Sequence, residues 1–304
     1  MTGKLFIIHL FVLLLLSSCR SSTRRHVGFE FPDSDSIPVS EVEHLSDEAI
    51  DDISRNISSP VEIADILQKM SVPFSSAYLA SSIDATRLGT SFETALKLGI
   101  LGADLGYLNM YEKTGNSIDV LTSIKKLADG INVGQFFDFE TIKHLSLNRS
   151  SLDSLLFLSI SSFNQVDKFL REEGRGQLSS LIITGVWIEG QYLATQVLKQ
   201  VPDTLLRNRV GEQKVILNDL LMLLAPYCNS GTEYKVLCQD MQEIKDKYRN
   251  IRITYTIGEP VMVEKNGALV VVQTDQSKVE MTDEQLNEII SASAEIRNKI
   301  ISDN

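Results

Sequence analysis

Two predicted helices are apolar on nearly every side, and this feature limits the possible folds of the chain most strongly. The first contains LGILGADLGYL between Leu98 and Leu108, and the second is apolar around most of its circumference between Leu152 and Leu158. A helix without a polar face has to be covered on all sides. Both segments therefore predict a central position in a layered array of helices.

Three glycines interrupt the first of these segments, and each costs about 1 kcal/mol relative to alanine inside a helix. That cost indicates a neighbouring helix that approaches closely. A transmembrane dimer would explain the same pattern. Glu93, Lys97 and Asp104 argue against it, because they would carry charge into the bilayer.

The segment LIITGVWIEGQYL, residues 181–193, partly repeats the glycine-rich helix. Gly102 precedes Gly185 by 83 positions, and Tyr107 precedes Tyr192 by 85. One interpretation is a decayed duplication of a helical hairpin. The alternative is that buried helices share composition, and residues 181–188 could also form a strand, although the length of the segment favours a helix. Shorter apolar helices are predicted after the two copies, at 117–129 and 211–225.

Start and stop signals divide the rest of the helical domain. The sequence SPVE, from Ser59 to Glu62, carries an N-cap, a proline at the first helical position and an acid three residues after the cap. Ser91 likewise opens a helix over 92–111, and residues 115–116 break it before the next one. Further helices are predicted at 134–147, 151–172, 177–199, 211–225 and 232–249.

After residue 250 the pattern changes from helical to alternating. Residues 251–257 alternate apolar and polar side chains, which predicts a half-buried strand. Asn266-Gly267 between two β-forming runs, 261–265 and 268–272, is a strong hairpin signal. A capping box of Thr282 and Gln285 then opens a terminal helix.

These signals together predict a mainly α protein. We expect a layered antiparallel helical array over residues 58–250, followed by a small β-hairpin and helix over residues 251–304. About 55 residues are marginal as a free domain, so the second part is expected to pack on the first.

The N-terminus predicts export. The apolar run from residue 5 to residue 16 would reach only about 18 Å as a helix, short of the roughly 30 Å hydrocarbon core, so it indicates a signal peptide. The residues that follow, Leu16-Ser17-Ser18-Cys19, resemble the lipobox of bacterial lipoproteins, in the style of Bacteroidetes. The resemblance implies that residues 1–18 are removed and that Cys19 carries acyl chains such as palmitate. The alternative is an ordinary signal peptide with an incidental cysteine.

Residues 19–57 predict an acidic flexible tether. Nine acidic residues and no lysine or arginine lie between Glu30 and Asp52. An acidic run directly after the lipidated cysteine is associated with surface export in such lipoproteins, but here the arginines of residues 20–25 follow Cys19. That departure favours a lipid anchor on the periplasmic face of the cell envelope. The chain's net charge of -11 argues against nucleic acid as a partner.

Signals for catalysis are mostly absent. The sequence contains no zinc-protease, nucleophile-elbow, phosphate-loop or EF-hand motif, and after removal of residues 1–18 only His26, His44 and His144 remain. We therefore expect no metal site, no cofactor and no catalytic residue that the sequence alone can select. Cys228 and Cys238 can form a disulfide in an exported protein, or they can remain as two buried thiols.

Three functional hypotheses follow. The first is a lipid-anchored helical scaffold or binding protein, with Tyr107, Trp187 and Tyr192 lining a groove for an envelope protein or an apolar ligand, although such aromatics are more often core residues. The second is an envelope hydrolase that works through paired carboxylates. The third is a structural subunit of a larger envelope complex.

Overall fold

The computed structural model describes residues 28–30, 72–87, 89–147, 152–265, 268–272 and 276–302. The predicted signal peptide, Cys19, most of the tether and the helix expected after Ser59 lie outside these residues. The chain divides into two compact units. One unit comprises Met1–Glu30 with Thr254–Ser277, and the other comprises Phe31–Ile253 with Lys278–Asn304.

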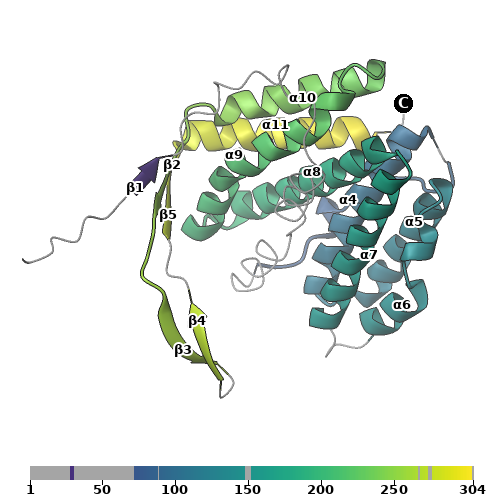
Figure 1. The fold of residues 1–304 in the computed structure, drawn as a ribbon, viewed down its shortest axis with the longest axis horizontal. Coiled ribbons are helices and arrows are strands. Elements are labelled where there is room, and N and C mark those ends of the chain that lie inside the picture. Colours follow the sequence, from purple (N-terminus) through teal and green to yellow (C-terminus); the bar gives the residue numbers. More distant parts are fainter. Residues whose placement is uncertain are drawn as a thin grey trace, which may run out of the picture. The chain divides into compact units, whose positions relative to one another are not determined.

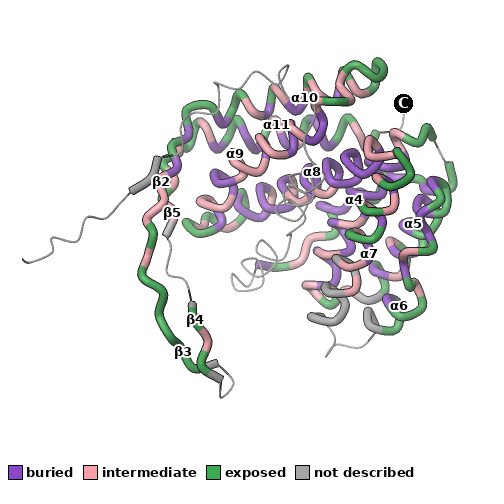
Figure 2. Tube along the Cα trace, in the orientation of Figure 1, coloured by how far each residue is buried: buried purple, intermediate pink, exposed green. Residues whose placement is uncertain are grey.

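The second unit is helical (Figure 1), and the prediction of a mainly α protein with a C-terminal β-hairpin and helix is confirmed. Figure 2 shows that buried residues concentrate along α4 and α8. The helices are α4 (Ser91–Met110), α5 (Thr114–Gly130), α6 (Phe139–Leu147), α7 (Leu152–Glu172), α8 (Gly176–Gln200), α9 (Thr204–Leu224), α10 (Thr232–Tyr248) and α11 (Asp283–Ile301).

The helix α4 approaches α8 so closely that their backbones touch. A Cβ atom added at Gly99 would collide with the carbonyl oxygen of Ile182, and one added at Gly185 would collide with that of Leu96. Gly102 faces the ring of Phe163 on α7, where an added Cβ would lie 2.7 Å from the ring. The predicted close approach is therefore confirmed at two of the three glycines of α4. It is wrong at the third, Gly106, which has nothing within 4 Å of an added Cβ.

The direction of the helices differs between pairs. Ser180 near the start of α8 donates to the carbonyl oxygen of Leu223 near the end of α9, whereas Trp187 bonds Gln213 in the middle of α9, so these helices run antiparallel. The two ion pairs between α10 and α11 show the same antiparallel order. By contrast α4 and α8 run in the same direction, because Gly99 lies against Gly185 and Asp104, further along α4, lies beside Glu189, further along α8.

The register of α4 on α8 bears on the predicted repeat. Gly99 lies against Gly185, and Asp104 lies beside Glu189, five and four residues further along the two helices. The sequence comparison had instead matched Gly102 with Gly185. The helical-hairpin duplication stays a prediction.

Several helix ends differ from the sequence expectation. Thr90, rather than Ser91, caps α4, and its hydroxyl accepts from the backbone N–H of Glu93. The break after α4 falls at residues 111–113, where Glu112 adopts a positive φ of 53°, and Gly115 lies inside the first turn of α5.

Two further helices begin at other residues than expected, α6 later and α9 earlier. A 3-10 turn over Gly134–Phe136 precedes α6. The helix α9 begins at Thr204, well before residue 211, because the carboxylate of Asp203 accepts from the N–H of Leu206 and caps it. The side chains of residues 152–157 lie outside the described set, so the central position predicted for that segment stays a prediction.

A disulfide joins Cys228, after the short 3-10 helix Ala225–Tyr227, to Cys238 on α10, with Cα atoms 5.8 Å apart. The structure thus contains one of the two alternatives that the sequence left open. Closing a loop of about ten residues stabilises the folded chain by roughly 2–3 kcal/mol on the chain-entropy view.

The strands form two small sheets. Strand β1 (Gly28–Glu30) pairs antiparallel with β2 (Arg252–Thr256), in a sheet of order β1-β2-β5 with β5 over Gln276–Glu280. The predicted hairpin is confirmed as β3 (Val261–Lys265) and β4 (Ala268–Val272).

Two boundaries therefore differ from the predicted domains. Residues 28–30 lie within the range expected to be a free tether, yet they form a strand. The hairpin belongs to the unit that contains the N-terminus, whereas α11, opened by the predicted Thr282–Gln285 capping box, belongs to the helical unit. α11 buries an apolar stripe, which includes Ile289 and Ile296, while Met262, Leu269 and Val271 of the hairpin are exposed.

Candidate functional site

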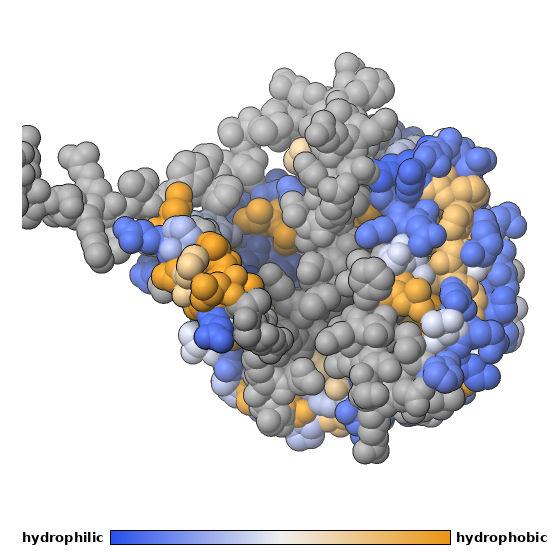
Figure 3. All heavy atoms as spheres, turned by 60° about the horizontal axis from the view of Figure 1, so that its bottom comes forward, coloured by the Kyte–Doolittle hydropathy of each residue, from blue (hydrophilic) through white to orange (hydrophobic). Residues whose placement is uncertain are grey.

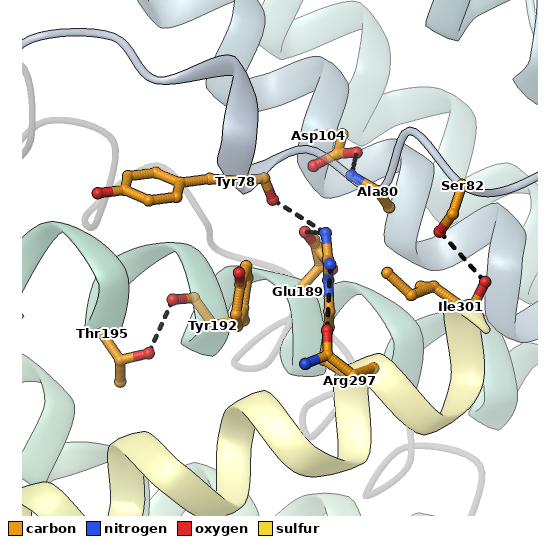
Figure 4. Close-up of polar contacts among 10 residues, drawn as sticks. Tyr78, Ala80, Ser82, Asp104, Glu189, Tyr192, Thr195, Arg297 and Ile301 are labelled. Atoms are coloured by element: carbon orange, nitrogen blue, oxygen red, sulfur yellow. Dashed lines mark hydrogen bonds and ion pairs between the residues drawn. The ribbon is translucent and has the colours of Figure 1, made fainter.

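The most concentrated group of charged side chains in the interior lies between three helices (Figure 4). Asp104 comes from α4, Glu189 from α8 and Arg297 from α11, and they expose 1%, 0% and 4% of their surface. A charge so deeply buried is stable only when it is paired and hydrogen-bonded. We call these three residues the buried polar cluster.

Arg297 and Glu189 form the centre of the buried polar cluster. The guanidinium donates from Nε to Oε2 of Glu189 at 3.0 Å and from Nη2 to Oε1 at 3.1 Å. This two-point geometry matches the planar fork of arginine to both carboxylate oxygens. It fixes α11 against α8.

The guanidinium also binds groups outside the carboxylate. Its Nη2 donates to the backbone carbonyl of Tyr78 at 2.9 Å, and its Cζ lies 4.4 Å from the ring centroid of Tyr192. A guanidinium over an aromatic face gains a cation–π attraction, which is stronger where water is excluded. Arg297 therefore joins α8, α11 and the chain segment that contains Tyr78.

Asp104 differs from Glu189 in having no cation of its own. Its Oδ2 accepts from the N–H of Ala80 at 2.8 Å, while Oδ1 has no donor among the described residues. Burial, together with the negative charge of Glu189, raises the pKa of Asp104 well above its usual range. Burial also raises the pKa of Glu189, but Arg297 opposes that rise.

Of the two acids, Asp104 is consequently the one whose surroundings favour the protonated form. A carboxylic acid at Asp104 can donate to the ionised Glu189, which gives the otherwise unpartnered Oδ1 a hydrogen bond. The cluster then holds one neutral acid, one anion and one cation, so its net charge is zero. A neutral, fully bonded group is the form in which such residues are tolerated in a protein interior.

The segment of residues 72–87 covers the buried polar cluster and is tied down by side chains on both sides of it. The backbone N–H of Ser75 donates to the hydroxyl of Tyr107 at 3.1 Å, and Ser82 donates to the carbonyl of Ile301 at 3.2 Å. Burial raises the pKa of Tyr107 to about 12, so its hydroxyl stays neutral. With the bonds at Tyr78 and Ala80, four contacts hold this segment on α4 and α11.

The chemistry open to the buried polar cluster depends on access. An acid beside a carboxylate is the pairing used in carboxylate-dependent hydrolysis. Here the three side chains expose 4% of their surface or less, and each is directed at the others or at the backbone. In this conformation the arrangement fastens four parts of the chain and presents no reactive atom to solvent.

The three aromatic residues predicted to line a groove occupy separate surroundings. Tyr107 is buried and stacks on Phe74, with ring centroids 5.5 Å apart. Trp187 is buried and donates to the side chain of Gln213 on α9 at 2.9 Å. Tyr192 is half-buried over Arg297. Tyr107 and Tyr192 both lie near Tyr78 and the buried polar cluster, whereas Trp187 is directed towards α9.

Other predicted sites are placed as follows. Cys19 lies outside the described residues, and His144 lies in the last turn of α6. Within the described part of the chain, no group of three or more histidine, cysteine, aspartate or glutamate residues is arranged to hold a metal ion. No helix among the described residues combines the length and apolar character needed to cross a bilayer.

Sequence reasoning did not select Asp104, Glu189 and Arg297 as a group. A signal was nevertheless present, because Asp104 and Glu189 are acids inside otherwise apolar helical segments. A charge in such a segment requires a buried partner. The identity of that partner, Arg297, more than one hundred residues later in the chain, could not be read from spacing.

Comparison with known proteins adds no relative. No family model, no curated protein and no solved structure matches the chain.

Proposed function

We propose that the chain is a lipid-anchored protein of the cell envelope that acts as a helical scaffold or binding protein. The observation that carries the proposal is the closure of the buried polar cluster. Its charged groups form hydrogen bonds with one another and with the segment of residues 72–87. The helical unit is thereby a fastened framework, and recognition of a partner falls to its surfaces.

The anchoring part of the proposal rests on the sequence. Leu16-Ser17-Ser18-Cys19 resembles the lipobox of bacterial lipoproteins, and residues 5–16 are too short to span a bilayer. Several acyl chains on one cysteine give a stable anchor, because each buried methylene adds about 0.8 kcal/mol. Arginines directly after Cys19 favour the periplasmic face.

The anchor is tested by following the lipid itself. Cells that express the chain are given labelled palmitate, and the Cys19→Ser variant serves as the matched control. We expect label on the wild-type protein and none on the variant, and the mature wild-type mass should correspond to a chain that begins at an acylated Cys19. Equal labelling of the two proteins would contradict the proposal.

A carboxylate-dependent hydrolase is the second candidate, favoured by the convergence of Asp104 and Glu189. Catalysis would require the segment of residues 72–87 to move away and expose the acids. Glu189→Gln separates the candidates. If the cluster only fastens helices, the variant loses thermal stability and no hydrolysis of glycoside or peptide substrates distinguishes it from wild type. An activity abolished by this variant while folding is retained would favour the hydrolase.

A binding or assembly role is tested with the anchored, full-length protein. The protein is crosslinked in intact envelopes, extracted in detergent and purified, with a Cys19→Ser preparation as the control. We expect at least one envelope protein to be recovered reproducibly and only with the wild type. Recovery of none in repeated experiments would count against both the scaffold and the structural subunit of a larger complex.

A further inference from the structure

The hairpin β3–β4 carries an exposed apolar face. Met262 lies directly opposite Val271 in the antiparallel register, and Leu269 lies two residues before Val271, so all three side chains share one face. Their exposed fractions are 66%, 69% and 68% for Met262, Leu269 and Val271. We call this set the hairpin face.

The other side of the hairpin is less open. Val261 and Val263, which alternate with Met262 along β3, are 43% and 38% exposed. A two-stranded hairpin is marginally stable alone in water, and a contiguous apolar surface of this kind marks a contact site. Figure 3 shows apolar side chains gathered at the surface of the molecule beside hydrophilic ones.

The place of the hairpin in the chain points to what covers this face. The hairpin and the N-terminal thirty residues belong to one compact unit, in which β1 pairs with β2. Cys19 precedes Gly28, the first residue of β1, by nine positions. Nine residues span at most about 30 Å, and a five-residue strand spans about 17 Å. An acyl group on Cys19 therefore keeps the hairpin within reach of the lipid surface.

We propose that the hairpin face lies on the lipid surface beside the anchored Cys19. The inference rests on the proposed lipid anchor. It gives the unit that contains β1 and the hairpin a defined role, which is to hold the protein against the membrane at a second point.

The small size of the hairpin face favours lipid over a protein partner. A standard protein interface takes about 20–30 residues from each side, whereas this face offers three large apolar side chains. A small contact is sufficient when an anchor on the same chain holds it near its target at high effective concentration. A hairpin that lies flat at headgroup depth also keeps its outer backbone edges hydrated, which the hydrocarbon core would prevent.

Charge identifies the kind of lipid. Residues 257–277 contain Glu259, Glu264 and Asp275 against the single basic residue Lys265. Glu264 lies opposite Leu269 on the hairpin face itself. An anionic surface would repel these carboxylates. The hairpin face is therefore suited to zwitterionic headgroups.

The test uses tryptophan as a depth probe in the full-length, lipidated protein. Val271→Trp and Met262→Trp place the probe on the hairpin face, and Leu205→Trp places it on α9 at a position that is 53% exposed in the other unit. The native Trp187 is only 5% exposed and supplies a constant background, which is subtracted with the wild type. Each protein is reconstituted into phosphatidylcholine vesicles with and without brominated acyl chains.

We expect emission from the two hairpin probes to shift to shorter wavelength and to be quenched by brominated lipid at least threefold more than emission from Leu205→Trp. Val263→Trp, on the opposite side of the hairpin, should be quenched less than Met262→Trp. Because the probes lie on two strands, the test survives failure of one variant to fold.

The outcomes separate this inference from the anchor. If the wild type carries no lipid and does not float with vesicles, the anchor has failed. If the protein floats but the hairpin probes are quenched no more than Leu205→Trp, the lipid contact is wrong although the anchor stands. A blue shift that appears only after envelope proteins are added would replace the lipid with a protein partner and overturn the inference.

Discussion

The buried polar cluster and the hairpin face have opposite relations to water. In the helical unit, two acids and an arginine expose 4% of their surface or less, while in the hairpin Met262 and Leu269 expose about two thirds of theirs. The polar groups are buried because each finds a partner within the chain. Among the described residues, the large apolar side chains of the hairpin face are instead exposed. Complete internal pairing thus indicates a structural role, and incomplete burial indicates a contact with something else.

The largest expected effect comes from removing the cation of the buried polar cluster. Arg297→Leu leaves Glu189 buried without its partner, so we expect the free energy of unfolding to fall by about 3–5 kcal/mol. Chemical denaturation measures this change. Arg87→Leu is the matched control, because that side chain is 83% exposed, and it should change stability by less than about 0.5 kcal/mol. Similar losses in both variants would mean that the cluster is not a fastening point.

Alanine substitutions at two glycines of α4 should change the free energy of unfolding in opposite directions. Gly99→Ala forces a methyl group against the backbone of α8 and should lower the free energy of unfolding by about 1–3 kcal/mol. Gly106→Ala meets no atom and should raise it by up to about 1 kcal/mol through helix propensity. Thermal unfolding of the two variants checks both signs. Stabilisation by both alanines would refute the backbone contact.

The protonation of Asp104 should give stability a pH dependence. The pKa of Asp104 is raised in the folded protein. The stabilisation from its protonated form is therefore complete below about pH 3.8, the pKa in the unfolded chain, and is lost as pH rises towards the pKa in the folded protein. Asp104→Asn mimics the neutral acid and does not ionise. From pH 4 upwards, the free energy of unfolding of Asp104→Asn should therefore rise relative to that of the wild type by up to about 1.4 kcal/mol per pH unit.

Denaturation of both proteins between pH 4 and pH 8 measures this difference. A constant difference across that range would show that Asp104 is ionised throughout in the folded state. Asp104→Ala provides a further comparison, since it removes the acceptor for the N–H of Ala80 and should destabilise at every pH.

The smallest effect is expected at the hairpin face. Leu269→Ser removes a side chain that is already 69% exposed, so unfolding of the helical unit should change by less than about 0.5 kcal/mol. Leu98→Ala is the contrasting variant, because Leu98 is completely buried and should cost about 2–5 kcal/mol. Circular dichroism during denaturation reports on both. A large loss with Leu269→Ser would show that the hairpin is part of the folded core.

Local patterns predicted much of the fold. The β3–β4 hairpin and the Thr282–Gln285 capping box were predicted from a few neighbouring residues, because the signals for them are local. The predicted helix ends were less accurate where more than one neighbouring residue can act as the cap. Thr90 and Ser91 can both cap a helix, and only the packing of α4 decides between them.

The candidate site was only partly predictable. The aromatic residues selected as a groove were chosen for size and polarity, yet Tyr107 and Trp187 found hydrogen-bond partners inside the protein. The packing of the hairpin on the helices, expected from its small size, stays a prediction. For the aromatic residues the missing information was which surfaces meet, and composition does not contain it.

By itself the sequence determined the helical class, the hairpin turn, the requirement that two apolar helices be covered, and the expectation of a lipid-bearing Cys19. These follow from periodicity, turn chemistry and short motifs, each of which depends on residues close together in the chain. Only the tertiary structure decided that α4 and α8 run in the same direction, that Asp104 and Glu189 meet Arg297, and that β1 joins the unit of the hairpin. These depend on contacts between residues far apart in the chain, which are selected by the packing of whole helices and by the cost of leaving a buried charge unpaired.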